Sequence, residues 1–182
     1  MASNDVNFGT GYATGMFYHA VESTALPAYP TDTLGNAWKE VGYISADGIT
    51  FSPAIASEQL KDWSKTIRRM TPSEDSPTVQ APIISTTAES LKTLFGPVTA
   101  GAASSAHGAT SAVTITANTM TDAEAFLFIG KDGDDTFMLG TTKGYVSTVD
   151  DITFTPGEAI TWNATITADQ WTFMKDNGQK TT

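Results

Sequence analysis

The feature that most constrains the fold is a repeated alternation of apolar and polar side chains along short stretches rich in threonine. A period of two residues is typical of a β-strand that buries one face. The clearest stretch covers residues 160–167 and reads Ile160, Thr161, Trp162, Asn163, Ala164, Thr165, Ile166, Thr167. The chain is therefore predicted to be mainly β.

Further strands are predicted wherever similar runs lie between glycine, proline or aspartate. A hairpin is predicted over residues 38–54, because Asp47 and Gly48 form a favourable turn between two alternating arms. A second, more charged strand pair is predicted over residues 58–63 and 66–70. The remaining strands are predicted at residues 16–21, 113–117, 125–130, 136–139, 145–149 and 152–155, and an extended stretch with three prolines is predicted from residue 72 through Ile83 and Ile84.

One helix is predicted over residues 87–95. Thr86 is expected to cap it and Glu89 to complete a capping box, while Gly96 and Pro97 end it. Its apolar face would consist of Ala88, Leu91, Leu94 and Phe95. Strands on both sides of a single helix indicate one domain over residues 1–182, folded as an antiparallel β-sandwich or barrel with one flanking α-helix.

Two segments have no such pattern. Residues 1–15 are polar and contain three glycines, and we expect them to form an N-terminal arm. Residues 22–36 contain Pro27 and Pro30 among small polar residues, which predicts a long loop. Long loops in compact domains are usually functional or disordered.

Composition excludes several classes of protein. The 182 residues carry a net charge of −10. They include no cysteine, and this absence rules out thiolate metal sites and disulfides. A nucleic-acid reader normally shows a basic stripe, whereas the bases here gather only at Lys61, Lys65, Arg68 and Arg69. The sequence shows no secretory signal and no long apolar run, so we expect synthesis and folding in a cytoplasm without membrane insertion.

The residues that could carry chemistry do not form a recognisable motif. Asp132, Asp134 and Asp135 lack the spacing of a calcium loop, which favours a plain turn. His19 and His107 have no partner at a catalytic or metal-binding spacing and are interpreted as a strand-surface and a loop histidine. No catalytic residue, metal ion or cofactor is predicted. The four tryptophans favour core packing or a subunit interface over a sugar platform.

Residues 37–51, AWKEVGYISADGITF, resemble the tail tube (major tail) proteins of long-tailed, siphovirus-type phages. Those proteins often carry a W-x-x-[LV]-G-[YW]-[IV]-S-x-[DE]-G pattern near the N-terminus. The similarity continues through Lys61-Asp62-Trp63-Ser64 and Ile67-Arg68-Arg69 and covers roughly residues 15–95.

The resemblance implies a structural virion protein rather than an enzyme. Members of the family form hexameric rings, which stack into a tube around a tape-measure protein, and their strands close one large barrel around the lumen. Tail terminator and distal tail proteins would be further partners. Viral DNA would pass through the tube into the host without adhering, and an acidic, hydroxyl-rich lumen suits that passage because it offers phosphate no cations.

These implications select two sets of residues. The polar faces of the two predicted strand pairs are expected to line the lumen through Glu58, Asp62, Thr50 and Ser52. The subunit interface is expected to involve Tyr29, Leu34, Trp38, Tyr43 and Trp63. Residues 1–15 and the 22–36 loop are expected to reach adjacent subunits or the next ring. The alternative functions are an inner tube protein of a contractile tail or secretion system, a carbohydrate-binding β-sandwich module, and a β-sandwich hydrolase.

Overall fold

The computed structural model describes residues 14–55, 57–72, 75–103, 105–106, 108–116 and 121–177. This part of the chain is mainly β, with antiparallel sheets and a single helix, as the sequence predicts. The elements are β1 (Thr14–Val21), β2 (Lys39–Tyr43), β3 (Thr50–Ser52), β4 (Ser57–Lys61), β5 (Ile67–Pro72), β6 (Thr78–Ile83), α1 (Ala88–Phe95), β7 (Val98–Gly101), β8 (Thr110–Val113), β9 (Glu124–Asp132), β10 (Asp135–Val149), β11 (Trp162–Thr167) and β12 (Thr172–Asp176).

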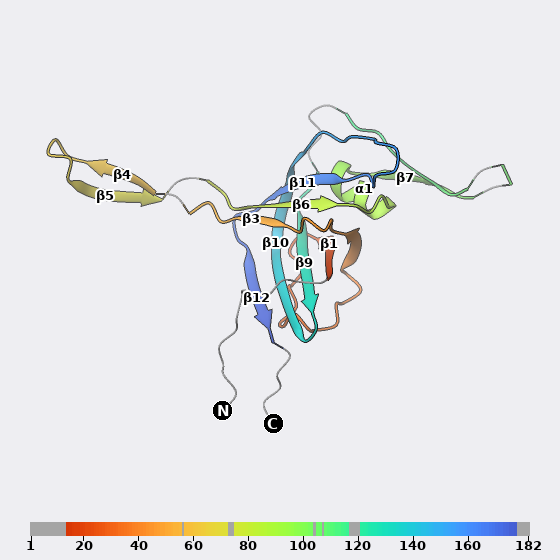
Figure 1. Ribbon diagram of the computed structural model, residues 1–182, viewed down its shortest axis with the longest axis horizontal. Coiled ribbons are helices and arrows are strands. Elements are labelled where there is room, and N and C mark those ends of the chain that lie inside the picture. Colours follow the sequence, from red (N-terminus) through yellow and green to blue (C-terminus); the bar gives the residue numbers. More distant parts are fainter. Residues whose placement is uncertain are drawn as a thin grey trace, which may run out of the picture.

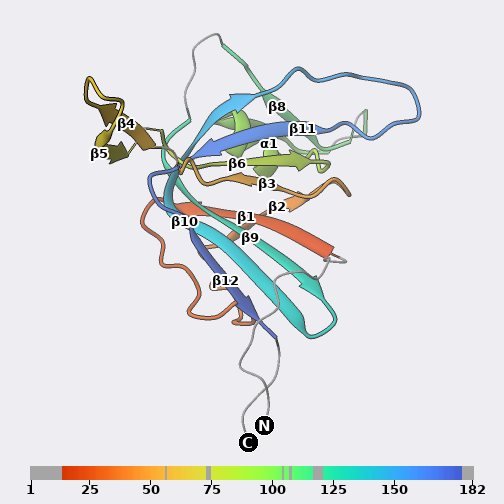
Figure 2. The same cartoon turned by 60° about the vertical axis from the view of Figure 1, so that its left-hand side comes forward.

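Two layers of strands share the long strand β10. One layer has the order β2-β1-β9-β10 with β12 on the far edge of β10, and the other has the order β10-β11-β6-β3. Figure 2 shows the two layers one above the other, with α1 beside β6 and β11. The arrangement is a β-sandwich with one flanking helix, and it confirms the predicted fold class.

The sheet closes on itself beyond the end of β2. Ile44 forms an isolated bridge with Ile83, and the Ser45 N–H donates to the Pro82 carbonyl over 2.8 Å. The chain after β2 therefore pairs with β6, although β2 itself pairs with β1. This closure pairs one border of the sandwich with backbone hydrogen bonds and leaves fewer open strand edges.

The main core lies between the two layers and under α1. Phe17 and Phe128 stack with ring centroids 4.4 Å apart, and both rings are fully buried. Trp162 packs edge-to-face against Phe95 of the helix, with centroids 5.5 Å apart. The predicted alternation of β11 is confirmed, since Trp162, Ala164 and Ile166 are the buried residues of that strand.

A second, smaller core lies on the opposite face of β9. It contains Trp38 and Leu127, and Leu26 and Leu34 of the 22–36 loop pack against it. The uninterrupted apolar run of β9 follows from this position, because a strand buried on both faces has no need for alternation. The loop therefore covers the outer face of the layer that contains β9.

The predicted hairpin over residues 38–54 is wrong. Asp47 and Gly48 do form a turn, with a Gly48 φ of 73° and a 2.9 Å bond from its N–H to the Ser45 carbonyl. The chain on both sides of the turn, however, runs along β6, which pairs with Ile44 and again with β3. The chain therefore runs in the same direction along β6 before and after the turn.

Other boundaries also differ. The strands predicted at residues 136–139 and 145–149 are one 15-residue strand, β10, which bends at a register shift between Thr141 and Gly144. A Cβ on Gly144 would lie 3.0 Å from a ring carbon of Phe126, so this glycine permits the close approach at the bend. Residues 152–155 form no strand, and the strand predicted at 113–117 is β8, which ends at Val113.

The helix begins one residue later than predicted. Thr87, rather than Thr86, is the N-cap, and Ser90, rather than Glu89, completes the capping box. Thr86 instead accepts a 2.9 Å hydrogen bond from the Trp162 indole N–H. The end of the helix at Gly96 is confirmed by its positive φ of 91°.

Candidate assembly surfaces

A two-stranded hairpin, β4 and β5, stands away from the sandwich at one end of the molecule (Figure 1). We call residues 57–72 the arm. Its only strand pairing within the described chain is between its own two strands. Three large apolar side chains are exposed on it, and Trp63 at its tip is fully exposed: Leu60, Trp63 and Ile67.

The tip of the arm is fixed by Asp62. Its carboxylate accepts hydrogen bonds from the Ser64 hydroxyl at 2.6 Å, the Thr66 N–H at 3.0 Å and the Arg68 Nε at 2.6 Å. Led by the bond from Ser64, these donors lower the pKa of Asp62 below its ordinary value of 3.8. The tip therefore has an ordered turn that presents Trp63 to solvent.

An apolar groove of about 690 Å³ opens where the two layers diverge. One wall is formed by side chains of β9, β10 and β12, and the other by the segment between β2 and β3 together with Phe51. The floor reaches the buried core at Phe128 and Leu139, while Tyr43 and Phe173 are about half exposed at the rim. The groove is thus a part of the core that the chain does not cover with its described residues.

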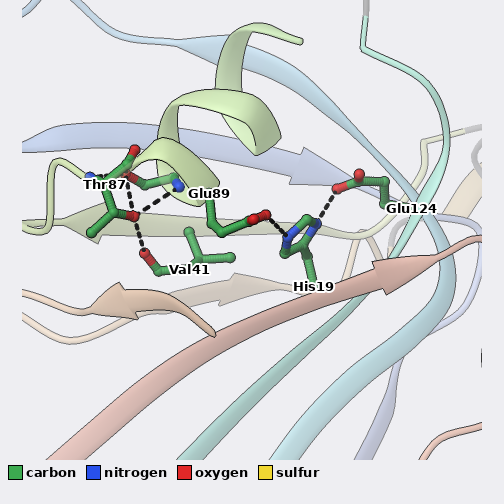
Figure 3. A network of polar contacts seen from close by, with 6 residues as sticks. His19, Val41, Thr87, Glu89 and Glu124 are labelled. Atoms are coloured by element: carbon green, nitrogen blue, oxygen red, sulfur yellow. Dashed lines mark hydrogen bonds and ion pairs between the residues drawn. The ribbon is translucent and has the colours of Figure 1, made fainter. Parts of the chain in front are cut away.

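A buried histidine joins the three elements β1, β9 and α1 (Figure 3). His19 of β1 is 3% exposed, its Nδ1 lies 2.9 Å from Glu124 of β9, and its Nε2 lies 3.2 Å from Glu89 of α1. Both ring nitrogens face carboxylate oxygens, which accept hydrogen bonds but donate none when ionised. A ring nitrogen that carries a proton donates to the carboxylate beside it, and these contacts tie the helix to the sheet.

This network differs from the sequence interpretation, which placed His19 on a strand surface. Its partners lie 70 and 105 residues away in the chain, and no local pattern points to them. His107 lies outside the described residues. The aspartates 132, 134 and 135 form the predicted turn between β9 and β10, where Asp132 pairs with Asp135 across the strands.

The 22–36 loop is attached to its own domain at several points. Lys143 forms a 2.8 Å ion pair with Glu22, and the Thr31 hydroxyl donates to Asp176 over 3.0 Å. Tyr29 remains exposed on the loop, and its backbone N–H donates to Asp32. The N-terminal arm predicted at residues 1–15 lies outside the described residues up to residue 13, and its last two residues belong to β1.

The predicted interface residues lie in different parts of the structure. Trp63 lies at the tip of the arm, Tyr43 on the rim of the groove and Tyr29 on the 22–36 loop. Trp38 is 9% exposed in the second core, and Leu34 packs beside it, so both mainly contact their own chain.

The predicted lumen residues lie on two elements. Thr50 and Ser52 are exposed on β3, and Glu58 lies on β4 opposite Thr71. Asp62 is engaged at the tip of the arm. Sequence reasoning missed the groove residues Phe137 and Phe173, and no local pattern in the sequence marks either of them as part of a groove.

Within the described residues, no group of three or more His, Cys, Asp or Glu side chains is placed to hold a metal ion. Nor does the described part contain a helix long and apolar enough to cross a membrane. The domain has an exposed apolar arm and an uncovered apolar groove. Exposed apolar surfaces of this kind mark sites of contact with other proteins.

The comparison with protein families identifies the kind of assembly. The chain matches the family described as phage tail tube protein over residues 1–176 and therefore belongs to that family. The comparison with curated proteins returned no match. Membership makes this chain a structural component of a phage tail, and thus of the virion.

Proposed function

We propose that this chain assembles into hexameric rings that stack into the tail tube of a long-tailed, siphovirus-type phage, through which the viral DNA enters the host. The observation that carries the proposal is the arm, whose three large apolar side chains are exposed in the single chain. Exposed apolar surface of this kind marks a contact with another protein. Family membership indicates that this contact lies within a tail tube.

The charge of the chain supports a conduit for DNA. Each lysine or arginine that faced the lumen would add a favourable phosphate contact, which would have to break as DNA moves. At −10 per chain, a ring has ample acidic surface to line its channel. Thr50 and Ser52 on β3 are our first candidates for the lumen, because both are exposed and polar. Glu58 and Asp62 are the second candidates, on the condition that the arm lines the channel.

The proposal includes further partners. A tape-measure protein would occupy the tube during assembly, and tail terminator and distal tail proteins would contact its two ends. Synthesis and assembly would take place in the cytoplasm of the host. Tyr29, on an exposed loop far from the arm along the chain, is proposed to contact a neighbouring subunit.

Electron microscopy of the purified protein tests the proposal. We expect rings and tubes in negative stain at high protein concentration, six-fold symmetry in averaged end views, and an acidic lumen in a reconstruction. Protein that stays monomeric at every concentration, and is missing from purified phage tails, would contradict it. A contractile sheath outside the tube in intact virions would replace the siphovirus assignment with a contractile tail.

A further inference from the structure

We propose that the arm of one copy docks its apolar tip into the apolar groove of a second copy of this chain. The inference rests on the proposed function, because it names the surfaces through which subunits would associate. It starts from two uncovered apolar surfaces of one chain, the arm tip at Trp63 and the groove between the diverging layers.

The shapes and chemistry of the two surfaces match. The tip is a narrow hairpin that presents Leu60, Trp63 and Ile67, and the groove has room for about 690 Å³. The lining of the groove contains no charged residue, and Tyr43 and Phe173 at its rim are half exposed. An aromatic anchor that enters an apolar pocket is the usual centre of a strong protein interface.

Charge favours the same partner. The arm contains four basic and two acidic residues, a net charge of +2, whereas the other 166 residues contain six basic and eighteen acidic ones, a net charge of −12. Both arginines of the chain, Arg68 and Arg69, lie on the arm. At the groove, Asp47 is exposed between two lining residues, and the adjacent segment 131–135 has one lysine and three aspartates. A basic arm is thus complementary to the acidic body of another copy.

The two surfaces are different patches of one chain, so the contact is head-to-tail. Such a heterologous contact leaves one free arm and one free groove on every dimer, and it continues until a ring closes or a filament grows. Docking in the groove would also place Glu58 and Asp62 at a subunit contact, with Thr50 and Ser52 left as the lumen candidates.

Engineered cysteines provide the test, because the chain has no cysteine of its own. One variant carries Lys65→Cys at the tip, a second carries Ala46→Cys in the groove, and a control carries Glu158→Cys on an exposed loop that does not line the groove. Two variants of different tagged length are mixed under mild oxidation, and the mixed disulfide is measured on non-reducing gels. We expect the tip to couple to Ala46→Cys at least tenfold faster than to Glu158→Cys.

Two additional variants identify what occupies the groove. Adding Trp63→Ser to the tip variant should reduce the coupling to the level of the Glu158→Cys control, while circular dichroism shows an unchanged fold. Equal coupling at both positions would overturn the inference. Residues 1–13, which precede the groove residue Gly15, are the rival occupant. Faster coupling of Phe8→Cys than of the tip to Ala46→Cys would assign the groove to them and also overturn it.

Microscopy of the Trp63→Ser variant separates this inference from the proposed function. Normal tubes from the variant would refute the role of the arm but leave the tail tube function intact. Absence of rings and tubes from the unmodified protein under all conditions would instead refute the tail tube function.

Discussion

Replacing Glu124 by glutamine is expected to destabilise the folded domain measurably, because it replaces the closer and more buried of the two carboxylates that contact His19. The Glu124 carboxylate lies 2.9 Å from His19 Nδ1, and its side chain is 21% exposed. Glu89 lies 3.2 Å from the other ring nitrogen, and its side chain is 44% exposed. The two carboxylates contact the same ring but differ in burial and in distance, so their two Gln variants can be compared directly.

The expected magnitude follows from the hydrogen bonds. A bond between charged groups contributes about 1.5–3 kcal/mol and a neutral one about 0.5–1.5 kcal/mol. Glutamine can still accept from Nδ1, so Glu124→Gln should cost the difference between the two ranges, about 1–1.5 kcal/mol. Solvent screens the more exposed pair, so Glu89→Gln should cost about 0.5 kcal/mol. For a domain of this size, Glu124→Gln should lower the Tm by about 3–6 °C.

Urea unfolding followed by tryptophan fluorescence measures these differences at a protein concentration low enough to prevent assembly. Glu158→Gln, on an exposed loop, serves as the control and should be neutral. In the His19→Gln background, the cost of Glu124→Gln should fall, because the two residues are coupled. A cost for Glu124→Gln equal to that of the control, or smaller than that of Glu89→Gln, would refute the stabilising role of the His19–Glu124 hydrogen bond.

Three further predictions concern local structure. Gly130→Ala should cost about 1–3 kcal/mol in urea unfolding, because the new Cβ would overlap the ring of Phe137. Gly157→Ala serves as the control with a smaller expected cost, because its Cβ meets no neighbouring atom and only its positive φ is strained. Thr87→Ala should cost about 1 kcal/mol through loss of the N-cap, measured in the same way. Because the folded-state pKa of Asp62 is lowered, its stabilisation of the arm tip is present above pH 3.8 and lost as pH falls below it. The protection of the backbone amides of the tip against hydrogen exchange, measured relative to the intrinsic exchange rate at each pH, should therefore fall below that pH.

The sequence predicted those parts of the fold that depend on neighbours in the chain. Alternation located β11, the apolar run located β9, and Gly96 located the end of α1. The turn between β9 and β10 was also predicted, because aspartate and glycine favour it for backbone reasons. Each of these signals extends over ten residues or fewer.

Pairing between distant strands could not be predicted in this way. The Asp47-Gly48 dipeptide has the composition of a hairpin turn, yet β2 and β3 pair with β1 and β6, which lie elsewhere in the sequence. Closure of the sheet against β6 decides that outcome, and it depends on hydrogen bonds such as the one from Ser45 to Pro82. His19 was misplaced for the same reason, since Glu89 and Glu124 meet it only in the folded domain.

The arm shows why surface function is harder to predict than fold. Its apolar residues could equally have formed a core hairpin, and only the folded chain shows that Leu60, Trp63 and Ile67 contact solvent. Within the single chain Trp63 is fully exposed and Leu60 and Ile67 are roughly half exposed, so burial within the domain does little to explain their presence. Docking on a second copy would remove them from water, at about 25 cal/mol for each Å² of apolar surface buried. The free energy of such a contact would stabilise the assembly and not the single domain. The exposed arm therefore has a physical reason only in the assembled state.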